Sequence, residues 1–224
     1  MNDKQLVAIE ASKLVQDGMV VGLGTGSTAN FFIEALAQRQ QQGLNISTIA
    51  SSTISAIKAA ACGLTLMDFA QASQVDLYVD GADEISPHLT LLKGRGQDLV
   101  MEKLLAHYAK SFVVVADKSK LVSRIGEDFV IPIEVMPSAW KMVKAQLLEL
   151  GATGDIRLNA SQDNVAVTAS GSYVLDMRFP IQYDEKRLND LLNAIPGVVE
   201  HGIFYGLTQQ VMIADQGKIE IKQA

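Results

Sequence analysis

The chain has 224 residues, of which 48% are hydrophobic and 20% charged, and its formal net charge at pH 7 is −6. These values are ordinary for a globular chain that buries a real core, and they leave no room for a long disordered tail. The acidic balance disfavours nucleic acid and anionic membranes as partners, and no apolar run is long enough to span a bilayer.

Helical and strand patterns alternate along the first half of the chain. They predict helix 3–16, strand 19–23, helix 28–40, strand 45–50, helix 55–61, strand 64–67, strand 75–79, helix 98–109 and strand 112–116. This alternation is typical of βαβ units and therefore of a mostly parallel sheet. Near the C-terminus, segment 209–221 has the pattern of a hairpin around Gln216 and Gly217, which we expect to rejoin this sheet.

A different pattern begins near Phe129. It predicts strand 130–135, helix 139–150, strands 155–158 and 172–178, helix 185–194 and strand 198–203. The order βαββαβ is that of the ferredoxin-like split unit. We therefore predict an α/β fold, with a Rossmann-like domain at 1–128 and 204–224 and a small α+β ferredoxin-like lid domain at 129–203.

The segment VVGLGTGSTAN at 20–30 runs from an apolar strand into a glycine loop and then a helix. Backbone N–H groups in such a loop, together with the helix dipole, favour a phosphate. The loop lacks the lysine of a Walker A motif, but Gly24, Gly26 and Ala29 fit GxGxxA, so a nucleotide-dependent oxidoreductase is a rival interpretation. That fingerprint expects an acid at the end of the next strand. The chain has hydroxyls there instead, at 51–53, and these suit a phosphate better than a ribose diol.

The segment VDLYVDGADEISPHLTLLKGRGQDLVMEK at 75–103 concentrates charged groups after a buried strand. Asp80, Asp83 and Glu84 follow the carboxyl end of the strand, where open α/β sheets bind ligands. DGAD alone is also a common turn sequence, and the acids alone would suit magnesium or calcium. Lys93, between Leu92 and Gly94, supplies the positive charge that a cation would bring, so we expect no metal.

Glu102 lies about one helical turn after the glycines of the KGRG segment at 93–96, on a helix whose apolar stripe includes Leu99 and Leu105. We expect its carboxylate to border apolar surface. Such an environment disfavours the charged form and makes a carboxylate a useful proton acceptor. The cluster of acids, lysine and semi-buried glutamate is therefore typical of a proton-transfer enzyme.

Six motifs, in order, resemble those of the type A ribose-5-phosphate isomerases, over nearly the whole chain. They are GLGTGSTA at 22–29, YVDGADEI at 78–85, LKGRGQDLVMEK at 92–103, ADKSK at 116–120, IPIEVMP at 131–137 and NAIPGVVEHGIF at 193–204. The resemblance implies interconversion of ribose 5-phosphate and ribulose 5-phosphate in the pentose phosphate pathway, without metal or organic cofactor. The single cysteine, Cys62, fits a reducing cytoplasm.

The resemblance also implies roles for individual residues. Glu102 is similar to the family's proton acceptor, with Asp80, Asp83 and Lys93 as further catalytic groups. The implied substrate-binding residues are Lys4, Thr25, Gly26, Ser27, Thr28, Asp80, Gly81, Ala82, Asp83, Lys93, Gly94, Arg95, Gly96 and Lys120. Arg95 and Met101 depart from the family pattern, in which many members have KGGG and Arg-Glu-Lys.

Family members are usually oligomeric, so we expect a homodimer or a higher homo-oligomer. The apolar segment around Ile203 and Phe204 is the expected interface. A non-catalytic sugar-phosphate sensor is the remaining alternative, because related folds occur in transcriptional regulators, but the acidic balance and the absence of a helix-turn-helix segment disfavour DNA binding.

Overall fold

The computed structural model describes residues 2–224, and it divides by contacts into two compact units. The first unit comprises 1–82, 101–120 and 207–224, and the second comprises 83–100 and 121–206. Segments 83–100, 121–128 and 204–206, predicted for the Rossmann-like domain, group with the second unit instead. Among the described residues, no helix has the length and apolar character to cross a membrane.

The first unit is built on a mostly parallel sheet, as predicted. Among residues 2–224 its strand order is β13-β12-β6-β3-β1-β2. Among the strand pairs that the described residues form in this sheet, the terminal pair β12–β13 is antiparallel and the others are parallel. The strands are β1 (Val20–Leu23), β2 (Ser47–Ala50), β3 (Val75–Asp80), β6 (Ala109–Asp117), β12 (Gln210–Asp215) and β13 (Lys218–Gln223). The direction of winding reverses between β1 and β3, which is where open α/β sheets bind ligands at the carboxyl ends of the strands.

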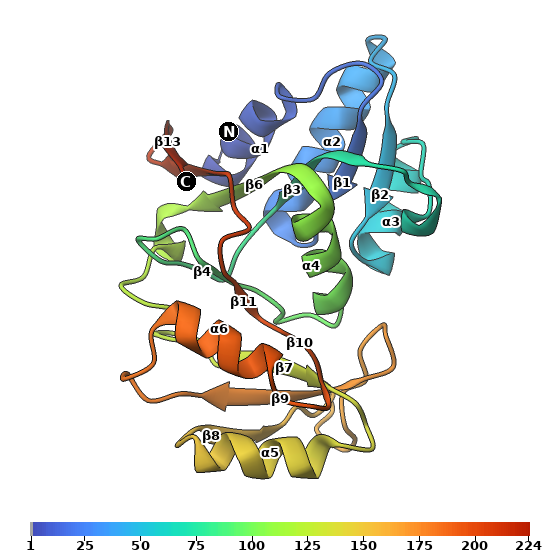
Figure 1. Ribbon diagram of the computed structural model, residues 1–224. Coiled ribbons are helices and arrows are strands. Elements are labelled where there is room, and N and C mark those ends of the chain that lie inside the picture. Colours follow the sequence, from blue (N-terminus) through green and yellow to red (C-terminus); the bar gives the residue numbers. More distant parts are fainter. Residues whose placement is uncertain (1) are drawn as a thin grey trace. The chain divides into compact units, whose positions relative to one another are not determined.

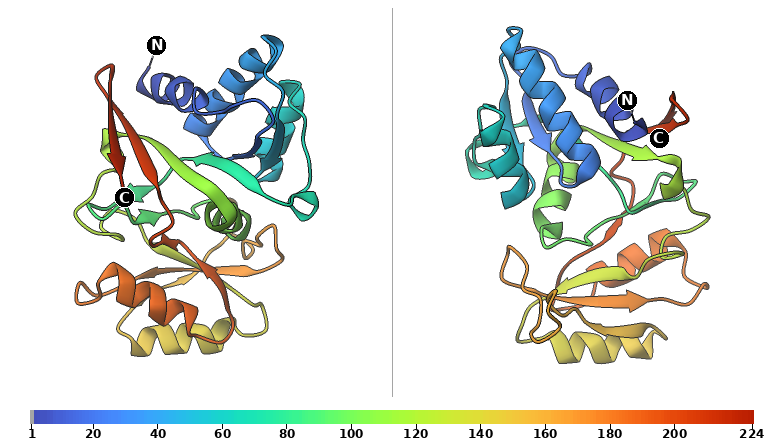
Figure 2. Two further views of the ribbon diagram at one scale, coloured as in Figure 1. Left: turned by 45° about the horizontal axis from the view of Figure 1, so that its top comes forward. Right: turned by 180° about the vertical axis from the view of Figure 1, so that it is seen from behind.

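Helices cover both faces of this sheet: α1 and α2 pack together on one face, and α4 lies on the other (Figures 1 and 2). The helices are α1 (Asp3–Ser12), α2 (Ser27–Gln41), α3 (Thr53–Ala61) and α4 (Leu99–Tyr108), with 3₁₀ turns η1 (Phe69–Gln71) and η2 (Lys118–Lys120). The predicted helix 3–16 ends early, at Ser12. The predicted strand 64–67 is reduced to one bridge between Thr48 and Leu66.

The start of α1 is fixed from two directions. Asn2 caps the helix, its side chain accepting a hydrogen bond from the Gln5 N–H at 2.8 Å. The Asp3 carboxylate accepts from the N–H groups of Gln216 and Gly217, in the turn of the C-terminal hairpin. The predicted hairpin is confirmed, and it holds the first turn of α1 against the edge of the sheet.

The second unit contains the predicted βαββαβ arrangement. Within the described residues its four strands lie in the order β10-β7-β9-β8, all antiparallel, which is the ferredoxin-like order. The elements are β7 (Ile131–Val135), α5 (Trp140–Glu149), β8 (Thr153–Ile156), β9 (Tyr173–Arg178), α6 (Glu185–Asn193) and β10 (Val198–His201). A further small sheet, β11-β5-β4, joins β4 (Glu84–Ile85), β5 (Leu91–Leu92) and β11 (Ile203–Phe204).

The predicted interface segment lies inside this unit. Ile203 and Phe204 are both 0% exposed, and Ile203 belongs to the apolar core of the second unit. The prediction that they serve an interface between chains is therefore wrong, because both side chains are already buried within the chain, on a strand that pairs with β5.

Glu84 is a structural residue in this unit. Its carboxylate is 0% exposed and accepts hydrogen bonds from the backbone N–H groups of Gly126, Asp128 and Phe129, at 2.6, 2.8 and 2.7 Å. A buried carboxylate is tolerated when donors surround it in this way. Glu84 therefore anchors the loop before β7 and is not available as a metal ligand or a base.

We predict that Glu84→Gln lowers the free energy of unfolding by about 3 kcal/mol, because the amide places a donor against backbone donors and loses charge-assisted bonds. Urea unfolding monitored by circular dichroism measures this. Glu149→Gln, the same change at an exposed position late in α5, is the control and should leave the unfolding midpoint nearly unchanged. Equal midpoints for both variants would contradict the anchoring role.

Candidate active site

Asp80 ends β3 and joins several parts of the first unit. Its side chain is 0% exposed. Oδ1 accepts from the N–H groups of Thr25 at 3.0 Å and Gly81 at 2.7 Å, and Oδ2 accepts from the Tyr78 hydroxyl at 2.5 Å. The carboxylate thus links the loop after β1 to the loop after β3, the two loops at the reversal of the sheet.

The close approach of these loops requires a glycine. A Cβ on Gly24 would lie 2.1 Å from Asp80 Oδ1 and 2.6 Å from Asp80 Cα, and the latter is backbone that cannot rotate away. The GxG pattern in the sequence therefore marks a contact between strand ends. The group that lies against Gly24 is a protein carboxylate.

The hydroxyls after β2 form an internal network. Thr25 Oγ1 lies 2.9, 2.7 and 3.0 Å from the hydroxyls of Ser51, Ser52 and Ser55, and Ser55 donates to the Gly24 carbonyl at 2.7 Å. Ser51 and Ser52 are 1% and 7% exposed. Both hydroxyls are bonded to Thr25 and so support its loop, and their contact with a phosphate stays a prediction.

Tyr78 brings Asp80 and Glu102 into one electrostatic environment. The Tyr78 side chain is 0% exposed and stacks on Phe112 at 4.9 Å. Burial, followed by the negative charges of Asp80 and Glu102, raises the pKa of Tyr78 well above its usual value. The phenol therefore stays protonated and donates to Asp80. Glu102 itself, on α4, is 8% exposed, in agreement with the expectation of a semi-buried carboxylate.

Basic groups gather at the carboxyl end of β6. Lys4 Nζ lies 3.1 Å from Ser27 Oγ. Burial acts to raise the pKa of Asp117, but hydrogen bonds from Ser119 and the charges of Lys4 and Lys120 outweigh it, so the pKa is lowered. Lys4, Ser27 and Lys120 therefore share one local environment in a chain whose net charge is −6.

The first turn of α2 adds backbone donors to this cationic group. Gly26 is its N-cap, and no side chain among residues 2–224 caps the helix there. Ser27 is exposed and Thr28 is partly exposed. The N–H groups at a helix start carry a partial positive charge, so this turn with Lys4 beside it suits an anion.

Of the remaining predicted residues, Ala82 lies in the first unit, and Asp83, Lys93, Gly94, Arg95 and Gly96 lie in the second. Lys93 follows β5 and is 4% exposed; its N–H donates to the Gly202 carbonyl at 2.9 Å, and its Nζ lies 5.7 Å from the Phe204 ring centroid. A Cβ on Gly202 would lie 2.4 Å from the Lys93 carbonyl oxygen, so only glycine permits this approach. The segment around Gly202 therefore fixes the backbone of Lys93.

Arg95 is the unusual member of the KGRG loop. Its guanidinium carbon lies 4.2 Å from the Phe129 ring centroid, and its Nη1 lies 3.9 Å from Asp83 Oδ1. The Arg95 side chain is 55% exposed and the Asp83 side chain 22%. Stacking on the Phe129 ring holds the Arg95 guanidinium beside Asp83. Arg95 therefore adds a positive charge to the loop at this point.

Several residues at these sites were missed in the sequence. Tyr78 could have been found, because residues two apart on a strand share a face and Asp80 was already a candidate. Ser55 could also have been found, because it follows Ser52 by three residues, which is the spacing of a helix N-cap. Arg157, which donates to the carbonyls of Gly94 and Gly96, gives no local signal.

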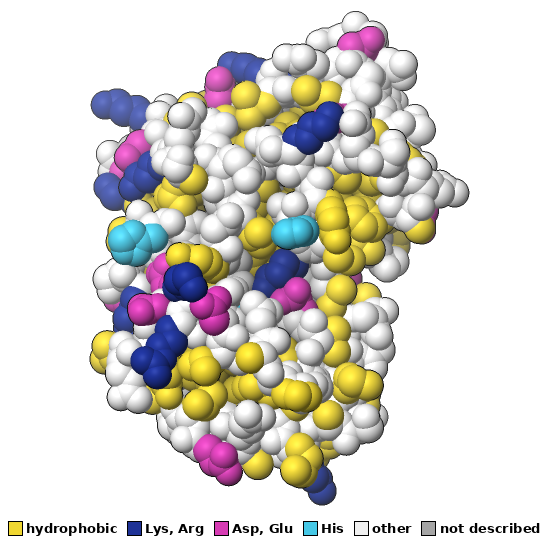
Figure 3. Space-filling view, in the orientation of Figure 1, with side chains coloured by type: hydrophobic (Ala, Val, Ile, Leu, Met, Phe, Trp, Pro, Cys, Tyr) yellow, Lys and Arg dark blue, Asp and Glu magenta, His cyan; other side chains and the backbone are white. Residues whose placement is uncertain are grey.

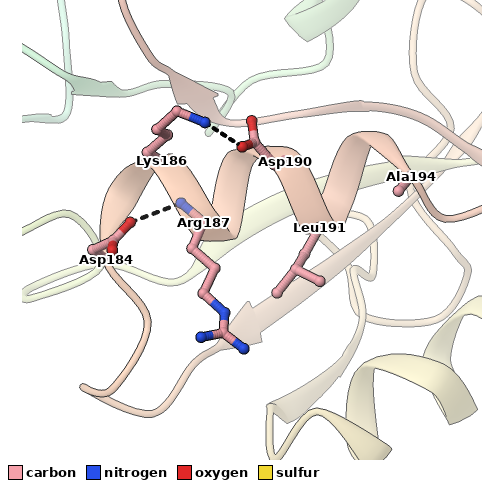
Figure 4. Close-up of a pocket in the computed structure, with 6 residues that line it drawn as sticks. All are labelled: Asp184, Lys186, Arg187, Asp190, Leu191 and Ala194. Atoms are coloured by element: carbon pink, nitrogen blue, oxygen red, sulfur yellow. Dashed lines mark hydrogen bonds and ion pairs between the residues drawn. The ribbon is translucent and has the colours of Figure 1, made fainter.

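Other features of the described residues carry less chemistry. No group of three or more His, Cys, Asp or Glu side chains in 2–224 has the arrangement of a metal site. A depression of about 340 Å³ lies along α6, but charged side chains that line it stabilise the helix itself. Lys186 pairs with Asp190 at 2.6 Å, and Asp184 caps α6 by accepting a hydrogen bond from the Arg187 N–H (Figure 4). Acidic and basic side chains are interspersed on the face seen in Figure 3, with no continuous basic surface there.

Comparison with known proteins identifies the family. The family model of ribose 5-phosphate isomerase A (phosphoriboisomerase A) matches residues 47–218. Ribose-5-phosphate isomerase A of Methanothermobacter thermautotrophicus is 41% identical over 222 residues, which cover 99% of this chain and 97% of that protein.

Solved structures agree over the full length. Ribose 5-phosphate isomerase A from Methanocaldococcus jannaschii superposes with a TM-score of 0.93 at 38% identity, covering 99% of this chain and 98% of that one. A D-ribose-5-phosphate isomerase in complex with phospho-erythronic acid superposes with a TM-score of 0.95 at 34% identity, and all of both chains is covered. The chain therefore belongs to the ribose 5-phosphate isomerase A family of isomerases.

Proposed function

We propose that the chain interconverts D-ribose 5-phosphate and D-ribulose 5-phosphate. The observation that carries this proposal is membership of the isomerase family along nearly the whole chain, including the segments that hold the candidate residues. The rival oxidoreductase would need an acid after β2, where the chain has Ser51 and Ser52. A purely regulatory role leaves the buried Glu102 without a purpose.

The phosphate of the substrate is proposed to bind in the first unit. A solved relative holds phospho-erythronic acid, a phosphorylated sugar acid. Here Lys4, Ser27 and Lys120 share one environment beside the first turn of α2. Ammonium groups and helix N–H groups are common partners of phosphate oxygens, and Thr28 adds a hydroxyl in the same turn.

Moving a carbonyl from C1 to C2 requires a base that removes a proton from one carbon and returns it to the other through an enediolate. One carboxylate placed beside both carbons can perform both transfers. Glu102 is the proposed base, because it is 8% exposed and stands near Asp80 and Tyr78, whose own groups are bonded to each other. A shielded carboxylate is well suited to accept a carbon-bound proton.

Lys93 and Asp83 are proposed to act on the substrate oxygens. The enediolate develops negative charge, and a preorganised ammonium such as that of Lys93 stabilises it as it forms. Asp83, whose side chain is 22% exposed, is the proposed group for binding hydroxyls and opening the furanose ring. Asp80 has its oxygens bonded to Thr25, Gly81 and Tyr78, so its proposed role is to hold the loops around the substrate.

The remaining features of the proposal follow from this reaction. An aldose–ketose isomerisation by proton transfer uses no organic cofactor, and the product belongs to the non-oxidative pentose phosphate pathway of the cytoplasm. A homodimer is also proposed, although its interface must use a face other than Ile203 and Phe204.

We predict that Glu102→Gln lowers kcat by at least about 10²-fold, the usual worth of a general base. Glutamine keeps the shape of the side chain and loses only the ability to accept the proton. Binding of phospho-erythronic acid, measured by calorimetry, should therefore not weaken.

Glu149→Gln is the matched control, because it makes the same change at an exposed position, and it should isomerise at the wild-type rate. If Glu102→Gln kept more than about a tenth of the wild-type kcat, the loss would be smaller than the smallest loss expected when a general base is removed, and Glu102 would not be the base.

Lys4→Met should raise KM for ribose 5-phosphate by about 10-fold or more and leave kcat nearly unchanged. A charge-assisted bond to the phosphate is made equally in the ground and transition states, so its loss weakens binding alone. Lys13→Met is the control, because it removes an exposed ammonium at the C-cap of the same helix, where Lys13 pairs with Glu10. A fall in kcat at constant KM would place Lys4 in the chemistry instead.

Activity should also survive removal of divalent metals, since the proposed electrophile is the Lys93 ammonium. The measurement is the steady-state rate after dialysis against excess chelator, compared with the same sample supplemented with magnesium. A rate that collapses in chelator and returns with magnesium would refute this part of the proposal.

A further inference from the structure

Arg157, directly after β8, connects the ferredoxin-like sheet to the KGRG loop within the second unit. Its guanidinium makes a two-point ion pair with Asp176 on β9: Nε lies 2.8 Å from Oδ2 and Nη2 lies 2.6 Å from Oδ1. The two side chains are 15% and 26% exposed. A planar guanidinium held at two points by a partly buried carboxylate has one orientation, so its remaining nitrogen points in a fixed direction.

That nitrogen, Nη1, points at the loop after Lys93. It donates to the carbonyl oxygens of Gly96 at 2.7 Å and Gly94 at 3.1 Å, and it lies 3.4 Å from that of Arg95. Three successive carbonyls thus converge on one cation. A second link holds the far end of the loop, where Ala169 N–H donates to the Gln97 carbonyl at 2.9 Å.

The convergence of the carbonyls determines where the N–H groups point. In a trans peptide the C=O and the following N–H lie on opposite sides. The N–H groups of Arg95 and Gly96 therefore point away from Arg157, as donors on the other side of the loop. The same clamp restrains the backbone that follows Lys93, whose N–H is already bonded to Gly202.

We infer that Arg157 is a positioning residue for the isomerisation: it holds residues 94–96 so that the Lys93 ammonium and the Arg95 and Gly96 N–H groups meet the sugar oxygens of the substrate. This inference rests on the proposed function. Lysine cannot replace Arg157, because one ammonium cannot bind both Asp176 oxygens and the loop carbonyls at once.

The test compares Arg157→Met and Arg157→Lys with Arg178→Met. Arg178 is the matched control, since it also is an arginine of this sheet, on β9, but is exposed. Within residues 2–224, its guanidinium donates one hydrogen bond, to the Asp128 carbonyl. We expect both Arg157 variants to lose about 10–100-fold in kcat, as for a small displacement of a catalytic group. Inhibition by inorganic phosphate should stay unchanged, because the phosphate group binds elsewhere.

Hydrogen exchange of the Lys93 and Ala169 amides gives a readout that does not depend on turnover. Both should exchange faster in the Arg157 variants and not in Arg178→Met. Normal kcat with normal exchange in folded Arg157 variants would overturn the inference. If the wild type itself did not isomerise ribose 5-phosphate, the proposed function would fail. Unchanged amide exchange in the Arg157 variants would by itself show that Arg157 does not hold the loop, whatever the activity of the wild type.

Discussion

The buried carboxylate of Asp80 is the interaction on which the first unit depends. It accepts hydrogen bonds from the Thr25 and Gly81 N–H groups and from the Tyr78 hydroxyl, and it is 0% exposed. Desolvating a carboxylate is costly unless donors surround it, so the ends of β1 and β3 are stable only in the arrangement that supplies them. Loop geometry at the reversal of the sheet follows from this requirement.

The consequence reaches the groups proposed to bind and react. Since Thr25 is held by Asp80 on its backbone and by serines on its hydroxyl, the chain that continues into α2 has a fixed path. This path places Ser27 beside Lys4. Tyr78, kept protonated by burial and by nearby acids, completes the Asp80 bonds and lies in the field of Glu102. Rigid support of this kind is what a proton-transfer site needs, because small displacements are costly to the rate.

Much of the fold could be predicted because its signals are local. Alternating elements gave the parallel sheet, and the βαββαβ order gave the antiparallel one, while the Gln216–Gly217 turn gave the C-terminal hairpin. The place of residues 83–100 in the second unit could not be predicted. Residues 83–100 lie between elements of the first sheet in sequence, yet β4 and β5 pair with β11 from far along the chain, and pairing at that distance leaves no local pattern.

The candidate site divides in the same way. Motifs identified Asp80, Lys93 and Glu102, since clustered charges after a strand are visible in the sequence. Their supports were not visible: the buried Glu84 resembled a third functional acid, Ser51 and Ser52 resembled phosphate ligands, and Arg157 lies in none of the motifs. Each of these roles depends on what a side chain meets after folding, which residue type alone does not determine.

In the proposed mechanism, a carboxylate moves a proton between neighbouring carbons through an enediolate. Isomerisation of ribose 5-phosphate in D₂O, followed by proton NMR through many turnovers, tests it most directly. We expect solvent deuterium to accumulate at C1 of ribulose 5-phosphate, because the protonated carboxyl group exchanges its proton with solvent while the enediolate is bound and then delivers deuterium to C1. Equilibrium between the two sugars reached without any carbon-bound deuterium would contradict it.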